Sequence, residues 1–262
     1  PYPQFTAYCN IDPFGSMRSV LHATAESVYF GTLGGKPCFV EEAGNLGPMI
    51  ASDEKSGDYV RASAFSAWAH DLRGYTWWCA HDQTELPQAP YDWHPQEREL
   101  GLLRGDGSPK PDLDELGRLA DFINNGFPYE KLPTRIKDAV CILSRSQDNW
   151  AAAFGAFMLS KQAGLDIDFA WCMDEIPEAD VYMLPSVCGG ASLPKHFTDV
   201  LFERVDRGAT LYVSINDGLL AEFERLFGLK VITRSRACGD TKFTIDGETF
   251  SINKPFTTIF ET

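Results

Sequence analysis

Several features common in proteins are scarce in this sequence of 262 residues, and each absence excludes a class of function. No apolar run reaches the roughly 18 residues that a membrane-spanning helix needs, and the first residues do not form a secretory signal. Lys and Arg number 23 against 37 Asp and Glu, and they form no basic cluster. We therefore expect neither a membrane nor a nucleic acid as a partner.

Motifs for binding metals and phosphates are also missing. The seven cysteines are scattered, without a CxxC pair or the Cys/His spacing of a zinc site. They are predicted to be reduced core residues, which favours a reducing, cytoplasmic compartment. No histidine has a partner at metal-ligand spacing and no glycine-rich phosphate loop is present, so neither a metal nor a cofactor is predicted.

The chain contains two patterns of predicted elements, joined by a stretch of turn residues. Residues 1–125 are predicted to alternate helix and strand with long connections, and residues 126–136, with two prolines and a glycine, are predicted to be a linker. Residues 137–240 alternate short apolar strands with helices; the strands are 138–143, 166–171, 180–184 and 209–215, and the helices are 149–163, 194–207 and 217–227. This alternation predicts a parallel, doubly wound α/β sheet covered on both faces.

Residues 241–262 are predicted to be the start of a truncated β segment. The dipeptide Asp246-Gly247 predicts a hairpin, and the chain stops at a strand-like run, 256–260, with no partner following. Because the chain also opens without a methionine, we interpret it as a piece of a longer protein.

Within residues 1–125 three helices are expected: one capped by Ser16 and ending near Gly34-Gly35, one over 58–71, and one with Pro111 in its first turn. The strands are expected to cover 37–42 and 74–80. The connection 81–110 is longer than ordinary loops. Loops of that length are usually functional or disordered.

Two carboxylates stand side by side where strand 37–42 ends, in the stretch FVEEAG. Because successive strand side chains point to opposite faces, Glu41 and Glu42 cannot share an environment. Glu42 lies on the face of small residues and Glu41 on the face of the bulky Phe39, a division typical of a barrel strand. Glu42 would then point inward at the carboxyl end, where parallel barrels keep catalytic groups, and Glu41 would be a salt-bridged outer carboxylate. An ordinary solvated strand-end acid is the alternative for Glu42.

The next strand, GYTWWCA (74–80), offers an aromatic partner. Alternation places Trp78 at the rim beside Glu42, while Trp77 packs under a helix. An indole is a good platform for the apolar face of a sugar ring. The alternative for Trp78 is a place in the core.

Three segments resemble, in this order, the last part of a retaining glycoside hydrolase barrel of the large clan whose catalytic acids lie on strands 4 and 7. They are Pro1-Tyr2-Pro3, KPCFVEEAG (36–44) and GYTWWCAHDQ (74–83). In that clan a His-Pro-Tyr-Pro-like segment often ends strand 6, a Glu-x-Gly context holds the nucleophile on strand 7, and a sugar-stacking Trp ends strand 8. The resemblance implies that residues 1–125 are the C-terminal part of a TIM barrel, from the end of strand 6 through helix 8.

By the same resemblance Glu42 is the nucleophile, Tyr2 lies against it, Trp78 stacks under the sugar and His81 contacts the substrate at the rim. The Glu-x-Gly context selects Glu42, in agreement with the alternation argument. The strand 4 segment, where an Asn-Glu pair would supply the acid/base, is absent from the sequence. A retaining glycosidase needs two carboxylates about 5–5.5 Å apart, so we expect this chain alone to be inactive.

Residues 137–240 resemble the flavodoxin-like domain that follows the barrel in family 42 β-galactosidases, a fold related to class I glutamine amidotransferases. In those glycosidases this domain helps oligomers form, which implies a homo-oligomer and suggests a trimer. Cys188 follows a predicted strand, as an amidotransferase nucleophile would, but its one downstream histidine is His196, eight residues later. We interpret Cys188 as a structural cysteine.

Two functions of different classes follow. The first is a glycosidase that cleaves β-glycosides, such as galactosides, through Glu42 without a cofactor. Its partner would be the missing N-terminal half of the barrel, which would cover the open strand edge. The second is a non-catalytic carbohydrate-binding or assembly module. An amidotransferase would rest on fold analogy alone.

Overall fold

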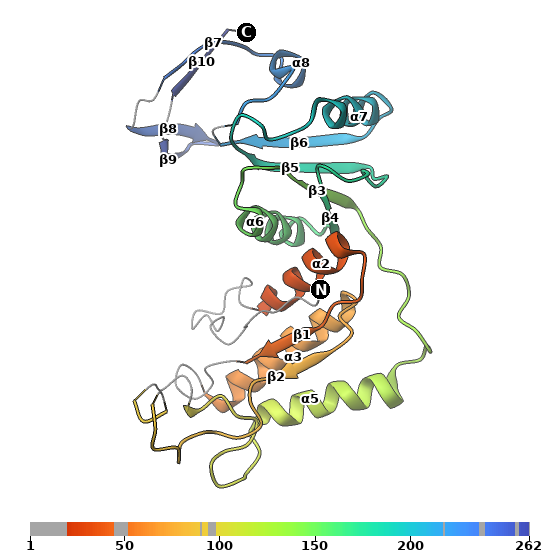
Figure 1. Ribbon diagram of the computed structural model, residues 1–262, viewed down its shortest axis with the longest axis vertical. Helices are drawn as coiled ribbons and strands as arrows, with labels where there is room; N and C mark the ends of the chain where they lie inside the picture. Colours follow the sequence, from red (N-terminus) through yellow and green to blue (C-terminus); the bar gives the residue numbers. More distant parts are fainter. Residues whose placement is uncertain are drawn as a thin grey trace.

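The computed structural model describes residues 20–44, 52–89, 91–93, 98–216, 218–235, 239–254 and 257–261. The described elements form a first lobe, residues 20–126, and a second lobe, residues 139–261 (Figure 1). The connection 127–138 contains no regular helix or strand. None of the described helices is long and apolar enough to cross a bilayer.

The first lobe alternates helices with two short strands. Its elements are, in order, α2 (His22–Gly34), β1 (Val40–Ala43), α3 (Asp53–Ala69), β2 (Tyr75–Trp77), α5 (Pro111–Asp121) and the π-helical turn η3 (Phe122–Gly126). Strands β1 and β2 pair in parallel, and within the described residues they are the whole of this sheet. Helix α3 begins five residues before the predicted start at 58, because the Ser52 side chain accepts a hydrogen bond from the Lys55 N–H and caps it.

The second lobe is built around a four-stranded parallel sheet with the strand order β4-β3-β5-β6. Its strands are β3 (Ala139–Leu143), β4 (Ile167–Trp171), β5 (Val181–Val187) and β6 (Thr210–Ile215), and its main helices are α6 (Asn149–Gln162) and α7 (Lys195–Asp206). Alternate residues of β3 face α6 and α7: Cys141 packs with Phe157 of α6, whereas Ile142 packs with Phe197 of α7. The predicted parallel α/β sheet with helices on both faces is confirmed, with boundaries close to those expected.

The end of the second lobe departs from the prediction in two places. The helix predicted over 217–227 is only the short α8 (Phe223–Phe227), because Glu222 has a left-handed backbone, with φ of 58°, and the helix begins after it. The strand-like run near the end of the chain is β10 (Thr257–Glu261), and it pairs with an earlier strand, β7 (Lys230–Ser235).

A hairpin lies between β7 and β10, as the sequence predicted. Strands β8 (Gly239–Ile245) and β9 (Glu248–Lys254) are antiparallel. Asp246 and Gly247 form the turn with φ values of 51° and 86°, the positive values of the two-residue turns that suit hairpins.

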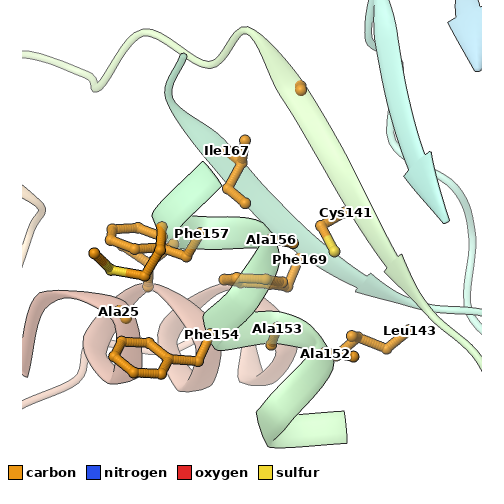
Figure 2. Close-up of a cluster of buried hydrophobic side chains, with 13 residues drawn as sticks. Ala25, Cys141, Leu143, Ala152, Ala153, Phe154, Ala156, Phe157, Ile167 and Phe169 are labelled. Atoms are coloured by element: carbon orange, nitrogen blue, oxygen red, sulfur yellow. The ribbon is translucent and has the colours of Figure 1, made fainter. Parts of the chain in front are cut away.

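The two lobes share a hydrophobic core. Helix α2 of the first lobe packs beside α6 and against β4 of the second lobe (Figure 1). Figure 2 shows Ala25 of α2 beside Phe154 and Phe157 of α6, in the same buried cluster as Phe169 of β4. Helix α2 is therefore enclosed by elements from both sides of the predicted linker.

Polar contacts join the lobes beside this core. The Thr32 hydroxyl of α2 accepts a hydrogen bond from the Phe169 N–H of β4 at 3.0 Å. At the end of α3, His70 Nε2 lies 2.6 Å from Lys161 Nζ of α6 and 3.4 Å from Asp166 Oδ1. The proposed domain boundary at 126–136 stays a prediction, but the parts on its two sides are packed together.

The cysteines of the described residues are free thiols, in agreement with the sequence analysis. Cys38, Cys141 and Cys172 are buried, whereas Cys79 and Cys188 are partly exposed. Burial raises the pKa of the Cys38 thiol to about 11, so it is protonated at neutral pH.

Candidate active site

The carboxyl ends of β1 and β2 lie side by side in the first lobe (Figure 1). The Val40 N–H donates to the Gly74 carbonyl at 2.9 Å, and the Trp78 N–H donates to the Ala43 carbonyl at 2.7 Å. Trp78 therefore stands directly beside the residue that follows Glu42. The two residues that the sequence analysis paired across neighbouring strands are brought to the same sheet edge.

Glu41 and Glu42 have different surroundings, as the strand alternation predicted. Glu41 is exposed, whereas Glu42 is partly buried between the fully buried Val40 and Ala43. The salt bridge expected for Glu41 is not found: among the residues that the structure describes, its side chain forms no ion pair. Of the two carboxylates, Glu42 is thus the more enclosed.

The two aromatic residues of β2 and the one that follows it have different surroundings. Tyr75 and Trp77 pack against the buried cluster of α2, α3 and β1, and burial raises the pKa of the Tyr75 hydroxyl to about 12. Trp77 Nε1 also donates to the Leu100 carbonyl at 2.9 Å. Trp78, the residue after β2, does not belong to that cluster and is 40% exposed, so its indole is accessible to solvent.

The segment after Trp78 is anchored on residues 99–103 and Lys110. His81 is exposed and forms an isolated parallel bridge with Leu103. The side chain of Asp82, the next residue, is buried in an ion pair with Lys110, with 2.6 Å between Oδ1 and Nζ. Among the described residues, the two ends of the predicted 81–110 loop are thus bonded to each other.

Sequence reasoning missed Asp82 and Lys110. They are 28 positions apart, and neither belongs to a motif or a periodic pattern that would relate them. Tyr2, the remaining predicted site residue, lies outside the described residues. No group of three or more His, Cys, Asp or Glu side chains in the described ranges could hold a metal ion.

The amidotransferase alternative concerns Cys188 in the second lobe. The Cys188 thiol follows β5 and donates to the Ser146 carbonyl, in the loop between β3 and α6. His196, the second residue of α7, is exposed. The thiol is thus engaged by a backbone carbonyl.

The arrangement at β1 and β2 can serve one kind of chemistry. It combines a partly buried carboxylate with an accessible indole at the carboxyl ends of adjacent parallel strands. A carboxylate can act as a nucleophile or as an acid/base, and an indole can stack on a sugar ring. The geometry thus defines the class of site: a partly buried carboxylate and an exposed indole at one sheet edge of an α/β scaffold.

Comparison with known proteins gives the fold class. No protein-family model matches the sequence, and no curated protein is similar to it in sequence. Among solved structures, an exo-β-1,4-mannosidase from an Opitutaceae bacterium (strain TAV5) matches with a TM-score of 0.75 and 15% identity, over 99% of this chain and 48% of that chain. The chain has a fold similar to that of TIM-barrel glycoside hydrolases.

Two β-galactosidase structures give the same result. A GH42 β-galactosidase matches with a TM-score of 0.63 and 10% identity, over 99% of this chain and 41% of that chain. A β-galactosidase from the psychrophilic Marinomonas ef1 matches with a TM-score of 0.59 and 11% identity, over 93% of this chain and 40% of that chain. The chain spans less than half the length of each of these structures, and at such low identity the likeness concerns the fold.

Proposed function

We propose that this chain supplies the nucleophile-bearing part of a retaining β-glycosidase, with Glu42 as the nucleophile and Trp78 as the sugar platform. The observation that carries the proposal is the juxtaposition of these two residues at the carboxyl ends of β1 and β2. It occurs in a fold that resembles those of a β-mannosidase and two β-galactosidases. A β-linked mannoside or galactoside is accordingly the proposed substrate class.

The proposed reaction has two steps at one carbon atom. The Glu42 carboxylate attacks the anomeric carbon and forms a glycosyl ester, while the aglycone leaves with a proton from a second carboxylic acid. Water, deprotonated by that same group, then attacks the anomeric carbon and releases the sugar and Glu42. We propose that the second carboxylate comes from a barrel segment outside this chain, so the chain alone is inactive.

The second lobe is proposed to be a flavodoxin-like domain. Its parallel strand order, β4-β3-β5-β6, agrees with the order 2-1-3-4 that begins the flavodoxin-like pattern. A role in forming a homo-oligomer, such as a trimer, follows from the family resemblance. Size measurement by light scattering would test the oligomer separately from the chemistry.

The proposal is tested by trapping the glycosyl ester. The full-length protein that contains this chain is incubated with 2-fluoro mannosides and 2-fluoro galactosides that carry a good leaving group, and the intact mass is then measured. We expect one sugar adduct, which peptide mapping assigns to Glu42. Glu42→Gln should abolish the adduct, because an amide cannot act as the nucleophile.

Glu41→Gln is the matched control, since it changes the neighbouring carboxylate, which is exposed. This variant should form the adduct as the wild type does. An adduct on Glu41 would refute the assignment of the nucleophile. Absence of any adduct from folded wild-type protein would refute the glycosidase, and sugar binding without an adduct would favour the carbohydrate-binding module.

A further inference from the structure

The position of Trp78 depends on the backbone around it. Its indole is 40% exposed, so packing alone holds it weakly. On one side the backbone N–H of Trp78 donates a hydrogen bond to the Ala43 carbonyl of β1. On the other side the chain continues into residues 79–82, whose backbone is hydrogen-bonded to a separate segment.

Residues 79–82 are held by a second segment, residues 100–103. The Cys79 N–H donates to the Leu100 carbonyl at 3.1 Å, and the Leu102 N–H donates to the Cys79 carbonyl at 3.0 Å. The Asp82 N–H donates to the Leu103 carbonyl at 2.8 Å. The two segments approach so closely that a Cβ on Gly101 would lie 2.1 Å from the Asp82 nitrogen.

A buried ion pair fastens these segments to the start of α5. The side chains of Lys110 and Asp82 are 3% and 7% exposed. Lys110 Nζ donates to the Glu99 carbonyl at 2.9 Å as well as to Asp82, whose Oδ1 also accepts from the Gly101 N–H at 2.9 Å. The Asp82–Lys110 ion pair therefore connects residues 79–82, residues 99–103 and the start of α5.

Stability alone does not account for this pair. Burying two charges is costly, and a well-packed apolar pair of similar volume often stabilises a fold equally well. An ion pair with hydrogen bonds to backbone groups fixes directions that an apolar pair leaves free. We propose that Asp82 and Lys110 are positioning residues that hold the Trp78 indole in register with Glu42, and so set the affinity for the sugar. The effect on sugar affinity depends on the function proposed above, whereas the position of the indole does not.

The position of the indole can be measured in this chain without a sugar. The protein is labelled with 5-fluorotryptophan, and Trp78→Phe assigns the Trp78 resonance in the fluorine NMR spectrum. The key variant is Asp82→Leu/Lys110→Met, which replaces the ion pair by apolar side chains and is chosen to preserve folding. We expect the Trp78 resonance to shift or broaden, while those of Trp150 and Trp171 in the second lobe stay unchanged.

Two further variants make this result specific. Asp82→Asn removes the charge and keeps an acceptor for the Gly101 N–H, so it should give a smaller shift and supply the answer if the double variant fails to fold. Lys195→Met removes one partner of an exposed ion pair on α7, Lys195–Asp199, and should leave the Trp78 resonance unchanged. An unchanged Trp78 resonance in folded Asp82→Leu/Lys110→Met would overturn the proposal.

The consequence for sugar affinity is measured on the full-length protein with the 2-fluoro glycoside that labels Glu42. The apolar double variant should raise the half-saturating inhibitor concentration about tenfold, the size expected for one lost stacking contact, with little change in the limiting rate. Trp78→Ala should have a similar effect, and combining the changes should add little. Effects that multiply would show that the pair acts independently of Trp78 and would overturn the proposal.

The outcomes separate the two proposals. If wild-type Glu42 is never labelled, the glycosidase assignment fails and the NMR experiment alone decides the positioning role. If Glu42 is labelled and the apolar variant behaves as wild type in both measurements, the glycosidase assignment stands and the positioning role fails.

Discussion

The core shared by the two lobes predicts that a substitution in α2 will weaken the second lobe as well as the first. Val28 is 3% exposed and belongs to the buried cluster that also contains residues of β3, β4 and α6. Val28→Ala removes two methyl groups. At about 0.8 kcal/mol per buried carbon, with a further term for the remaining cavity, we expect a loss of about 2 kcal/mol in the free energy of unfolding.

Native-state hydrogen exchange, read peptide by peptide by mass spectrometry, measures where this loss is felt. The comparison is made under conditions where exchange reports opening equilibria. The protection free energy should fall equally in peptides of the first lobe (β1 and α3) and in peptides of the second lobe (β3 and β4), because α2 belongs to the core of both lobes. Val205→Ala is the matched control. Val205 is 37% exposed on α7, so this substitution should change the free energy by less than about 0.5 kcal/mol.

The alternative result is distinct. If Val28→Ala weakens the peptides of the first lobe while those of β3 and β4 keep their protection, the lobes unfold separately. The inference of one cooperative core would then be wrong.

Two further predictions concern His70 and the N-terminus of α6. Burial lowers the pKa of His70, which faces Lys161, Asp166 and Arg135, so the neutral ring is favoured in the folded state. A lowered pKa gives a stabilisation that is complete above the ordinary pKa of about 6.5 and is lost as the pH falls below it. Urea denaturation should therefore show stability declining more steeply between about pH 7 and 5 in the wild type than in His70→Gln, and equal slopes would refute this role. At the N-terminus of α6, the Asp148 side chain accepts a hydrogen bond from the Ala151 N–H at 3.0 Å. Asp148→Ala removes this cap and should lower the free energy of unfolding by about 1 kcal/mol in the same assay, whereas Asp148→Ser should lower it by only a few tenths of a kcal/mol. Equal losses in the two variants would exclude capping.

Much of the second lobe could be predicted from the sequence, because its elements follow from local patterns. Strand β3 is a run of five buried residues, and α6 begins at a residue that follows the capping Asp148. The short α8 could not be predicted, because nothing local shows that Glu222 takes a left-handed backbone. The shared core was also missed, since contacts between residues far apart in the chain leave no periodic signal.

The candidate site was predicted in part for the same reason. Strand alternation distinguished Glu42 from Glu41, which differ in burial, and it separated Trp77, which packs against a buried cluster, from Trp78, which is exposed. Alternation is a property of the strand itself. The Asp82–Lys110 pair depends on the folding of a long connection, so the sequence allowed only the expectation that this connection is functional or disordered.

The place of α2 has a consequence for synthesis on the ribosome. Thr32 and its hydrogen-bond partner Phe169 are separated by 137 positions. At about 5–20 residues per second, roughly 7 to 27 s pass between the emergence of α2 and that of β4. Throughout that interval the side of α2 that packs against β4 lacks that strand. We expect the nascent chain to be a client of ribosome-associated chaperones, and a chain released before residue 167 to aggregate.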